Sequence, residues 1–217
     1  MQIRIIDMNA KNVLLSSVFG VVLAWTAVLH GQGQVTALQG WSGGQNYDWG
    51  ATTGFTFGWQ FQVNQDIQVN SLGVDDLGAA ADSHEVGIWN DAGILLAAAT
   101  VNFPGQSPNA FVWVGLGTPL DLSAGTYRIG AFFAGPATDI FVYTATSVTM
   151  APAITYLNSA CSDDTAFSFP NNTGWYSDAF FGPNFQYTTV PEPSVLALLG
   201  LGGLAMASWR RNRGNRK

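Results

Sequence analysis

The sequence between residues 38 and 189 predicts an all-β fold, an antiparallel β-sandwich of jelly-roll-like type. Residues 55–63 carry a large apolar side chain at every odd position, and a period of two puts all five on one face of a strand. Apolar runs recur about every ten residues, with turn-forming residues between them. Lysine is absent from this stretch and Arg128 is its single basic residue, whereas amphipathic helices need a charged wet face.

The first two strands are the clearest. The apolar face of residues 55–63 is expected to form core, with a binding platform as the alternative. Residues 67–74 follow with a change of apolar phase partway along. Such a change indicates a bulge, which we place near Asn70 and Ser71.

The later strands are separated by short turns. Residues 85–89 and 94–101 are expected to form a hairpin around a turn in which Gly93 takes a positive φ. Strands are also expected at residues 111–116, 126–133, 140–144, 154–157 and 184–188, which makes about nine.

The N-terminal segment, residues 1–37, has the layout of a signal peptide. Two basic residues precede an uncharged stretch at residues 12–29, and small residues follow. Residues 35–37, Val-Thr-Ala, fit the small-x-small cleavage rule, and residues 31–33 are the weaker candidate. An uncleaved membrane anchor is the alternative, because the stretch is nearly long enough to span a bilayer. We therefore expect a signal helix that engages the secretion machinery.

The C-terminal segment, residues 190–217, has three parts: two prolines flanking a glutamate, an uncharged stretch at residues 195–209, and a basic end. As a helix the uncharged stretch spans about 22 Å, which is short of the ~30 Å hydrocarbon core. A buried C-terminal helix is the alternative, but its glycines weaken a helix in water and basic residues follow at once. The residues that define the three-part signal are Pro191, Glu192, Pro193, Arg210, Arg211 and Arg213.

This tail resembles the PEP-CTERM sorting signal of exopolysaccharide-producing bacteria. The resemblance implies recognition by an exosortase, a membrane cysteine protease, and removal of the tail from the mature protein. An anchor that is never cleaved is the alternative. The implied location is the cell envelope, the outer surface or the biofilm matrix, with membrane attachment through the C-terminal helix at least before processing.

The charge of the central domain limits its partners. Residues 38–189 hold twelve of the fourteen acids and one of the eight basic residues, a formal net charge of −11. Such a surface repels nucleic acid and anionic lipid, and it suits divalent cations or neutral glycans better. Cys161 is the single cysteine, so no intramolecular disulfide is possible, and we expect it to be a small, partly buried residue.

Three phrases in the central domain resemble an uncharacterised β-sandwich family of bacterial surface proteins. They stand at residues 71–76, 82–89 and 122–130, and the resemblance covers about residues 55–135. It implies the sandwich fold. The role it implies is adhesion or support of the kind that carbohydrate-binding modules provide.

A loop rich in carboxylates is the candidate metal site. Asp75, Asp76 and Asp82 could supply part of a Ca²⁺ shell, since Ca²⁺ takes six to eight oxygen ligands. Their spacing matches no EF-hand, and a solvated loop is the alternative. No other cofactor is expected.

The sequence predicts no catalytic residue. Glu85 with Asp82 or Asp91 could be taken for a glycosidase pair, but proximity in sequence does not place two carboxylates across one cleft. His84 is the single histidine of the central domain, which cannot make a zinc set of several histidines, and packing or a hydrogen bond is its expected task. Arg128 is expected to pair with an acid.

Aromatic residues gather in polar sequence at the two ends of the domain. Trp41, Trp49, Trp175 and Tyr176 are the candidate ligand-binding residues, because aromatic faces in polar loops stack on sugar rings. Packing on the sandwich is the alternative.

These observations together predict an exported, non-catalytic surface or matrix protein with glycan binding as its candidate activity. A secreted carbohydrate-active hydrolase and a Ca²⁺-dependent adhesin are the alternatives.

Overall fold

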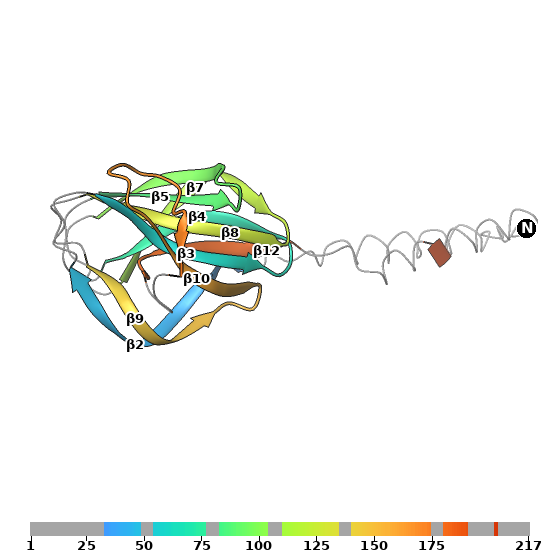
Figure 1. Ribbon diagram of the computed structural model, residues 1–217. Helices are drawn as coiled ribbons and strands as arrows, with labels where there is room; N and C mark the ends of the chain where they lie inside the picture. The colour runs from blue at the N-terminus through green and yellow to red at the C-terminus, as the bar shows by residue number, and fades with distance from the viewer. Residues whose placement is uncertain are drawn as a thin grey trace, which may run out of the picture. The chain divides into compact units, whose positions relative to one another are not determined.

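The computed structural model describes residues 33–48, 54–76, 83–103, 110–134, 140–174, 180–190 and 202–203. Within these ranges the chain forms β-strands that build two packed sheets and a ribbon (Figure 1). The strands are β1 (Val35–Thr36), β2 (Leu38–Asp48), β3 (Phe55–Val63), β4 (Ile67–Asp76), β5 (Ser83–Asn90), β6 (Leu95–Asn102), β7 (Ala110–Leu122), β8 (Gly125–Phe133), β9 (Ile140–Met150), β10 (Ile154–Ser162), β11 (Asn172–Thr173) and β12 (Pro183–Thr189).

The strands pair antiparallel throughout the described ranges. One sheet has the order β1-β12-β4-β7, the other has the order β11-β10-β3-β8-β5-β6, and β2 pairs with β9 in a separate ribbon. The ribbon joins the sheets along the chain, because β2 follows β1 and β9 precedes β10. The predicted all-β antiparallel sandwich is therefore confirmed.

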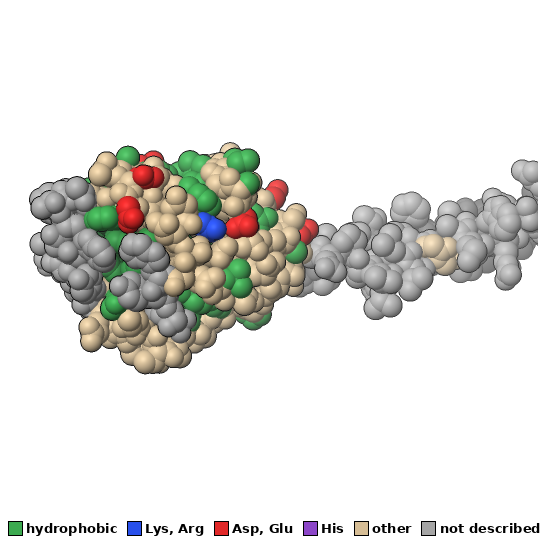
Figure 2. All heavy atoms as spheres, in the orientation of Figure 1, with side chains coloured by type: hydrophobic (Ala, Val, Ile, Leu, Met, Phe, Trp, Pro, Cys, Tyr) green, Lys and Arg blue, Asp and Glu red, His purple; other side chains and the backbone are tan. Residues whose placement is uncertain are grey.

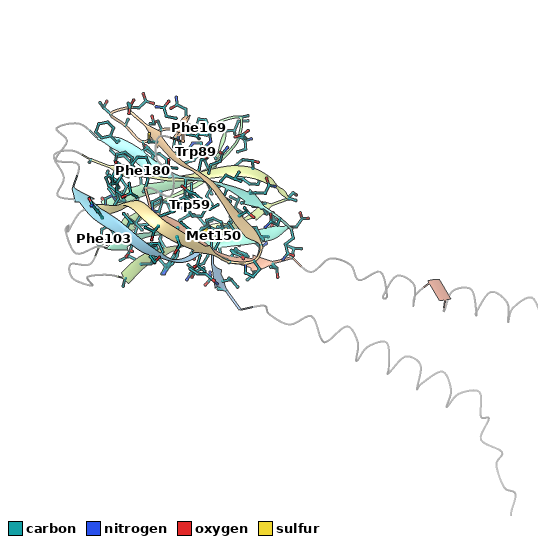
Figure 3. All side chains as sticks on the ribbon, turned by 60° about the horizontal axis from the view of Figure 1, so that its bottom comes forward. Trp59, Trp89, Phe103, Met150, Phe169 and Phe180 are labelled. Atoms are coloured by element: carbon teal, nitrogen blue, oxygen red, sulfur yellow. The ribbon has the colours of Figure 1, made fainter. Side chains whose placement is uncertain are left out.

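The core lies between the two sheets and is rich in aromatic side chains. The predicted apolar face of β3 points into it: Phe57, Trp59, Phe61 and Val63 are at most 4% exposed. Trp59 sits in the middle of the sandwich (Figure 3), where its indole N–H donates to the carbonyl oxygen of Pro183 on the opposite sheet at 2.8 Å. This face is core and not a binding platform.

The predicted bulge and hairpin are both confirmed. The register of β4 shifts at Asn70 against both of its neighbours, β12 and β7. Gly93 has a φ of 82° in the turn between β5 and β6. In that turn Asn90 accepts the N–H of Ile94 on its side-chain oxygen at 2.9 Å.

Several strands depart from the expected boundaries. β7 runs on to Leu122 and β9 to Met150, and β2 was not expected as a strand. The sequence of β2 is polar and rich in glycine, and two of its glycines, Gly43 and Gly44, have positive φ, so it lacks the alternation that marks a strand. Its partner β9 holds it in place through pairing that shifts register between Leu38 and Gly40 and between Ser42 and Gly43.

The two predicted terminal helices, of the signal peptide and of the sorting tail, lie outside the described residues apart from Gly202 and Gly203. Among the residues that are described, no helix is long and apolar enough to cross a membrane.

Candidate functional site

An open groove lies on the outside of the sandwich, between the first described residues and β7. Its volume is about 600 Å³. One wall is aromatic, from Phe111 and Trp113 of β7, and the other comes from residues 34–36 and residues 38–39. We call this feature the aromatic groove.

The aromatic wall follows from the alternation of β7. Phe111 and Trp113 are two residues apart and so share a face, and their rings stack with centroids 5.2 Å apart and planes 26° apart. Trp113 pairs with Gly73 of β4, and its ring covers that glycine closely enough for an added Cβ to collide with it. The glycine leaves room for the indole to lie close against the sheet.

Trp41 supports the aromatic wall from the ribbon. It is half-buried, contacts Phe111 edge-on at 6.5 Å and stacks on Phe181 at 6.0 Å. Of the four predicted ligand-binding aromatics, Trp41 thus adjoins the groove through Phe111. The other three, Trp49, Trp175 and Tyr176, lie outside the described residues.

The opposite wall is held by β12. Asn184 is fully buried, accepts the N–H of Leu38 at 3.0 Å and donates to the carbonyl oxygen of Leu38 at 2.9 Å. The N–H of Ala37 donates to the carbonyl oxygen of Phe185 at 2.9 Å. These contacts fix residues 34–39 to β12, and β12 and β4 lie between β1 and β7 in the sheet, so the two walls of the groove stand across these two strands from each other.

Polar side chains continue from the groove across the sheet. Gln34 donates to the hydroxyl of Ser71 at 3.3 Å, and Ser71 donates to the side-chain oxygen of Gln186 at 2.8 Å. Thr36 pairs with Gln186 in register, which puts hydroxyls and amides side by side on neighbouring strands. The polar part of the groove is therefore built from uncharged donors and acceptors.

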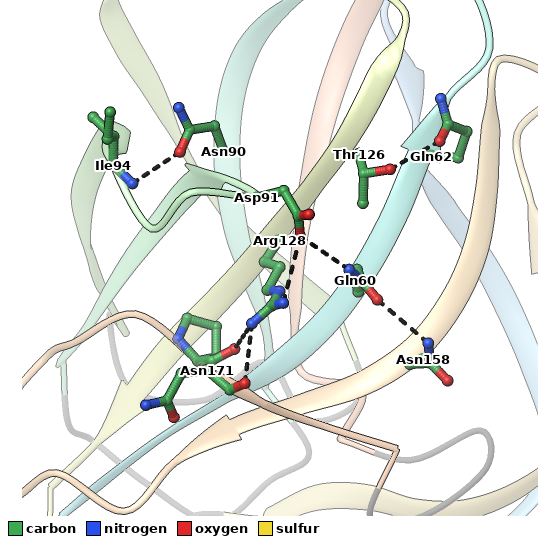
Figure 4. A network of polar contacts seen from close by, with 10 residues as sticks. Gln60, Gln62, Asn90, Asp91, Ile94, Thr126, Arg128, Asn158 and Asn171 are labelled. Carbon is green, nitrogen blue, oxygen red and sulfur yellow. Dashed lines mark hydrogen bonds and ion pairs between the residues drawn. The ribbon is translucent and has the colours of Figure 1, made fainter.

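A second polar network covers the outside of the six-stranded sheet and centres on Arg128 (Figure 4). Its guanidinium donates to the carbonyl oxygens of Pro170 and Asn171 at 2.8 and 3.2 Å, and to Asp91 at 3.4 Å. The predicted pairing of Arg128 with an acid is confirmed. Phe169 lies under the guanidinium carbon, 4.6 Å from ring centroid to carbon, which is within cation–π range.

The network extends over β3 and β10. Asp91 also accepts from the amide of Gln60 at 3.2 Å, and Gln60 in turn accepts from Asn158 at 3.3 Å. Figure 4 shows this chain of contacts running across the strands to the turn between β5 and β6. Arg128 thus links residues 170–171 and the turn between β5 and β6 to the outer face of the six-stranded sheet.

Residues 163–171, which we call the strap, cross the same sheet over a row of glycines. Gly58, Gly130 and Gly87 are neighbours in register on β3, β8 and β5. A Cβ on Gly87 would lie 2.7 Å from the ring of Phe167 and one on Gly130 would lie 3.3 Å from the ring of Pro170, so these two glycines make room for the strap. Trp89 packs against Phe167, with ring centroids 5.0 Å apart. It also packs against Phe169 at 6.4 Å (Figure 3). The strap and its packing were not foreseen, although the glycines were visible in the sequence.

The candidate Ca²⁺ ligands are only partly described. Asp75 is buried near the end of β4, and its backbone N–H donates to the carbonyl oxygen of Gly182 at 2.9 Å. Asp82 and the side chain of Asp76 lie outside the described residues. In the part of the chain that is described, no three His, Cys, Asp or Glu side chains group as a metal site. The Ca²⁺ site stays a prediction.

The considered carboxylate pair of Glu85 and Asp91 does not meet across a cleft. Glu85 lies near the start of β5 and Asp91 directly after its end. Six residues of extended chain span roughly 20 Å, whereas glycosidase pairs lie about 5–10 Å apart. Asp82 lies outside the described residues, so its pairing is untested.

His84 and Cys161 are both buried within the fold. His84 is 3% exposed, its Nδ1 lies 3.0 Å from the carbonyl oxygen of Phe132, and its ring packs on Phe133 at 4.6 Å. Cys161 is buried in the core. Burial, and secondarily the charge of Asp163, raises the pKa of the thiol to about 11, which keeps it protonated and a poor nucleophile at neutral pH. Both predictions, packing for His84 and burial for Cys161, are confirmed.

The residues that define the C-terminal signal, Pro191, Glu192, Pro193, Arg210, Arg211 and Arg213, lie outside the described residues. Comparison with known families tests them instead. Residues 189–213 match the PEP-CTERM protein-sorting motif. Proteins that carry this motif are exported to the cell surface, and the motif implies sorting by an exosortase.

The central domain has a family match of its own. Residues 33–181 match the family described as "Domain of unknown function (DUF4082)", which covers more than half of the chain. No curated protein matches the sequence significantly. Both predicted resemblances are confirmed: the chain belongs to the DUF4082 family, and it ends in a PEP-CTERM protein-sorting motif.

Proposed function

We propose that the protein is a non-catalytic component of the cell surface or extracellular matrix, associated with exopolysaccharide, which an exosortase releases from its tail. The observation that carries the proposal is the position of the sorting motif. It begins at residue 189, and β12, the last strand of the sandwich, ends at Thr189.

The tail can therefore leave without taking any described strand with it. The last described contact before the motif's prolines is the N–H of Val190, which donates to the carbonyl oxygen of Asp66 at 3.0 Å. Removing the tail would also remove five of the eight basic residues and leave the domain near −11. Such a charge keeps a released domain soluble and away from anionic lipid.

The experiment compares the wild-type chain with a variant carrying Pro191→Ala, Glu192→Ala and Pro193→Ala, in cells with and without the exosortase. Fractions of envelope, matrix and medium are probed with an antibody to the sandwich. The proposal predicts surface or matrix protein of reduced mass in wild-type cells, and membrane-held protein of higher mass in both the variant and the exosortase-deficient cells.

Two results would contradict the proposal. Wild-type protein that stays in the cytoplasm would refute export of this chain. Purified exported protein that releases reducing ends from polysaccharide would refute the non-catalytic role and favour the hydrolase.

A further inference from the structure

The aromatic groove combines features that select for one class of ligand. Phe111 and Trp113 offer ring surface at its wall, and both are only partly buried. Sugar rings present axial C–H groups that pack on such surfaces, while their rims carry hydroxyls. Binding sites for small or chain-like ligands typically unite an apolar surface with a few placed polar groups.

The polar groups around the groove match hydroxyl chemistry. Gln34 and Gln39 are exposed at its edge, and Thr36 lies between them. Amide and hydroxyl side chains both donate and accept, as sugar hydroxyls do. Ser71 is buried, and its contacts with Gln34 and Gln186 hold these two amide side chains beside the groove.

Charge decides between neutral and acidic polymers. The single cation of the central domain, Arg128, is committed to the strap on the other sheet. The face seen in Figure 2 shows one basic group among scattered acidic ones. A polyuronate or sulfated chain would meet a domain of net charge −11 with no arginine or lysine in the groove, so like charge would repel it.

We propose that the aromatic groove binds a chain of neutral polysaccharide, with a sugar ring on Trp113 and hydroxyls on Gln34, Thr36 and Gln39. This inference deepens the proposed function, since a matrix component that binds matrix polymer needs such a site. This site differs from the set of four aromatic residues predicted from the sequence. Of those four, Trp41 packs behind Phe111 and supports the wall of the groove.

The test uses the exported protein, purified from the medium or from detergent extracts of the envelope. The bacterium's own extracellular polysaccharide is separated on an anion exchanger into neutral and acidic fractions. Each fraction is cast into a native gel, and binding is read as slower migration of the protein. Because the domain carries a large negative charge, the protein migrates fast through the gel when no ligand is present.

The expected result is retardation by the neutral fraction alone. Trp113→Ala should weaken it about tenfold, as expected for loss of one aromatic stacking contact of about 1.4 kcal/mol. Gln34→Ala combined with Gln39→Ala should weaken it as well, and these two exposed residues can be changed without disturbing the core. Ile94→Ala, at a 60% exposed side chain in the turn between β5 and β6, is the matched surface control and should bind as wild type.

Two outcomes would overturn the inference. The first is retardation by the acidic fraction only, or by neither fraction. The second is retardation by the neutral fraction that the three groove substitutions, Trp113→Ala, Gln34→Ala and Gln39→Ala, leave unchanged. Thermal unfolding of each variant separates loss of binding from loss of fold. Because export and tail removal are measured separately, a correctly sorted protein that binds no polymer would refute this site and leave the sorting by an exosortase and the non-catalytic surface role standing.

Discussion

Trp113 lies over Gly73 on the outside of the four-stranded sheet, and the two residues pair in register between β7 and β4. The indole is therefore held in place while it stays partly exposed. Neither residue alone would define a site; their pairing presents the ring as one wall of the aromatic groove.

Gly73→Ala is expected to displace the indole. The new Cβ would collide with the ring of Trp113 and lie 2.7 Å from the carbonyl oxygen of Val112. Overpacking of this kind costs about 1–3 kcal/mol of unfolding free energy, which urea unfolding would measure. Gly115→Ala on β7 is the matched control, because nothing lies within 4 Å of its added Cβ. Equal stability of the two variants would show that the indole does not need Gly73.

Arg128→Ala should destabilise the protein more than Asp91→Ala. The Arg128 side chain is 12% exposed and donates to two carbonyl oxygens of the strap, whereas the Asp91 side chain is 59% exposed. Loss of hydrogen bonds from a charged group costs about 1.5–3 kcal/mol, while an exposed ion pair contributes at most about 1 kcal/mol. Urea unfolding compares the two variants, and limited proteolysis should cut the Arg128→Ala chain first within residues 163–171. A larger effect of Asp91→Ala would contradict this account.

Cys161 should make stability fall at high pH. Burial raises the folded-state pKa of the thiol from its ordinary value of 9.0 to about 11, so the unfolded chain loses the proton first as pH rises. The stabilising contribution is therefore complete below pH 9 and declines between pH 9 and about 11. Burial also raises the pKa of Tyr127 and Tyr187, so the test is the difference between wild type and Cys161→Ala. Identical pH profiles for the two proteins would contradict a buried, protonated thiol.

The exported chain is expected to begin at Gln34. Cleavage after Ala37 would remove β1, which pairs with β12. It would also break the chain at a residue whose N–H and carbonyl oxygen both make backbone hydrogen bonds at 2.9 Å. Cleavage after residue 33 keeps this strand. N-terminal sequencing of the exported protein decides between them, and a first residue of Leu38 would favour the original prediction for the leader.

Sequence patterns predicted the strands whose side chains alternate. β3 places its apolar residues on the core side, so its period of two was visible without any partner. β2 has no such pattern. Its pairing with β9 and the contacts of Asn184 with Leu38 hold it in place instead. Those contacts join residues that are distant in sequence.

The candidate site was harder to predict for the same reason. The aromatic groove unites residues 34–39 with Phe111 and Trp113, and the successive pairings of β1 with β12, β12 with β4 and β4 with β7 bring them together. Trp41 was predicted as a ligand-binding residue because it lies in polar sequence. In the structure it packs against Phe111, behind the wall of the groove. Gly73 was a usable signal, since a glycine within a strand often marks a close approach of another group.

The most direct test of the account follows the indole N–H signal of Trp113 by NMR. The signal is assigned by its disappearance in Trp113→Phe, a variant that keeps a ring in place. Oligosaccharides released from the neutral polysaccharide fraction are then added to the exported protein. The account predicts a selective shift of this signal, while that of the buried Trp59, bonded to Pro183, stays in place. An unchanged Trp113 signal alongside measurable binding would contradict the account, since the ligand would then lie elsewhere on the protein.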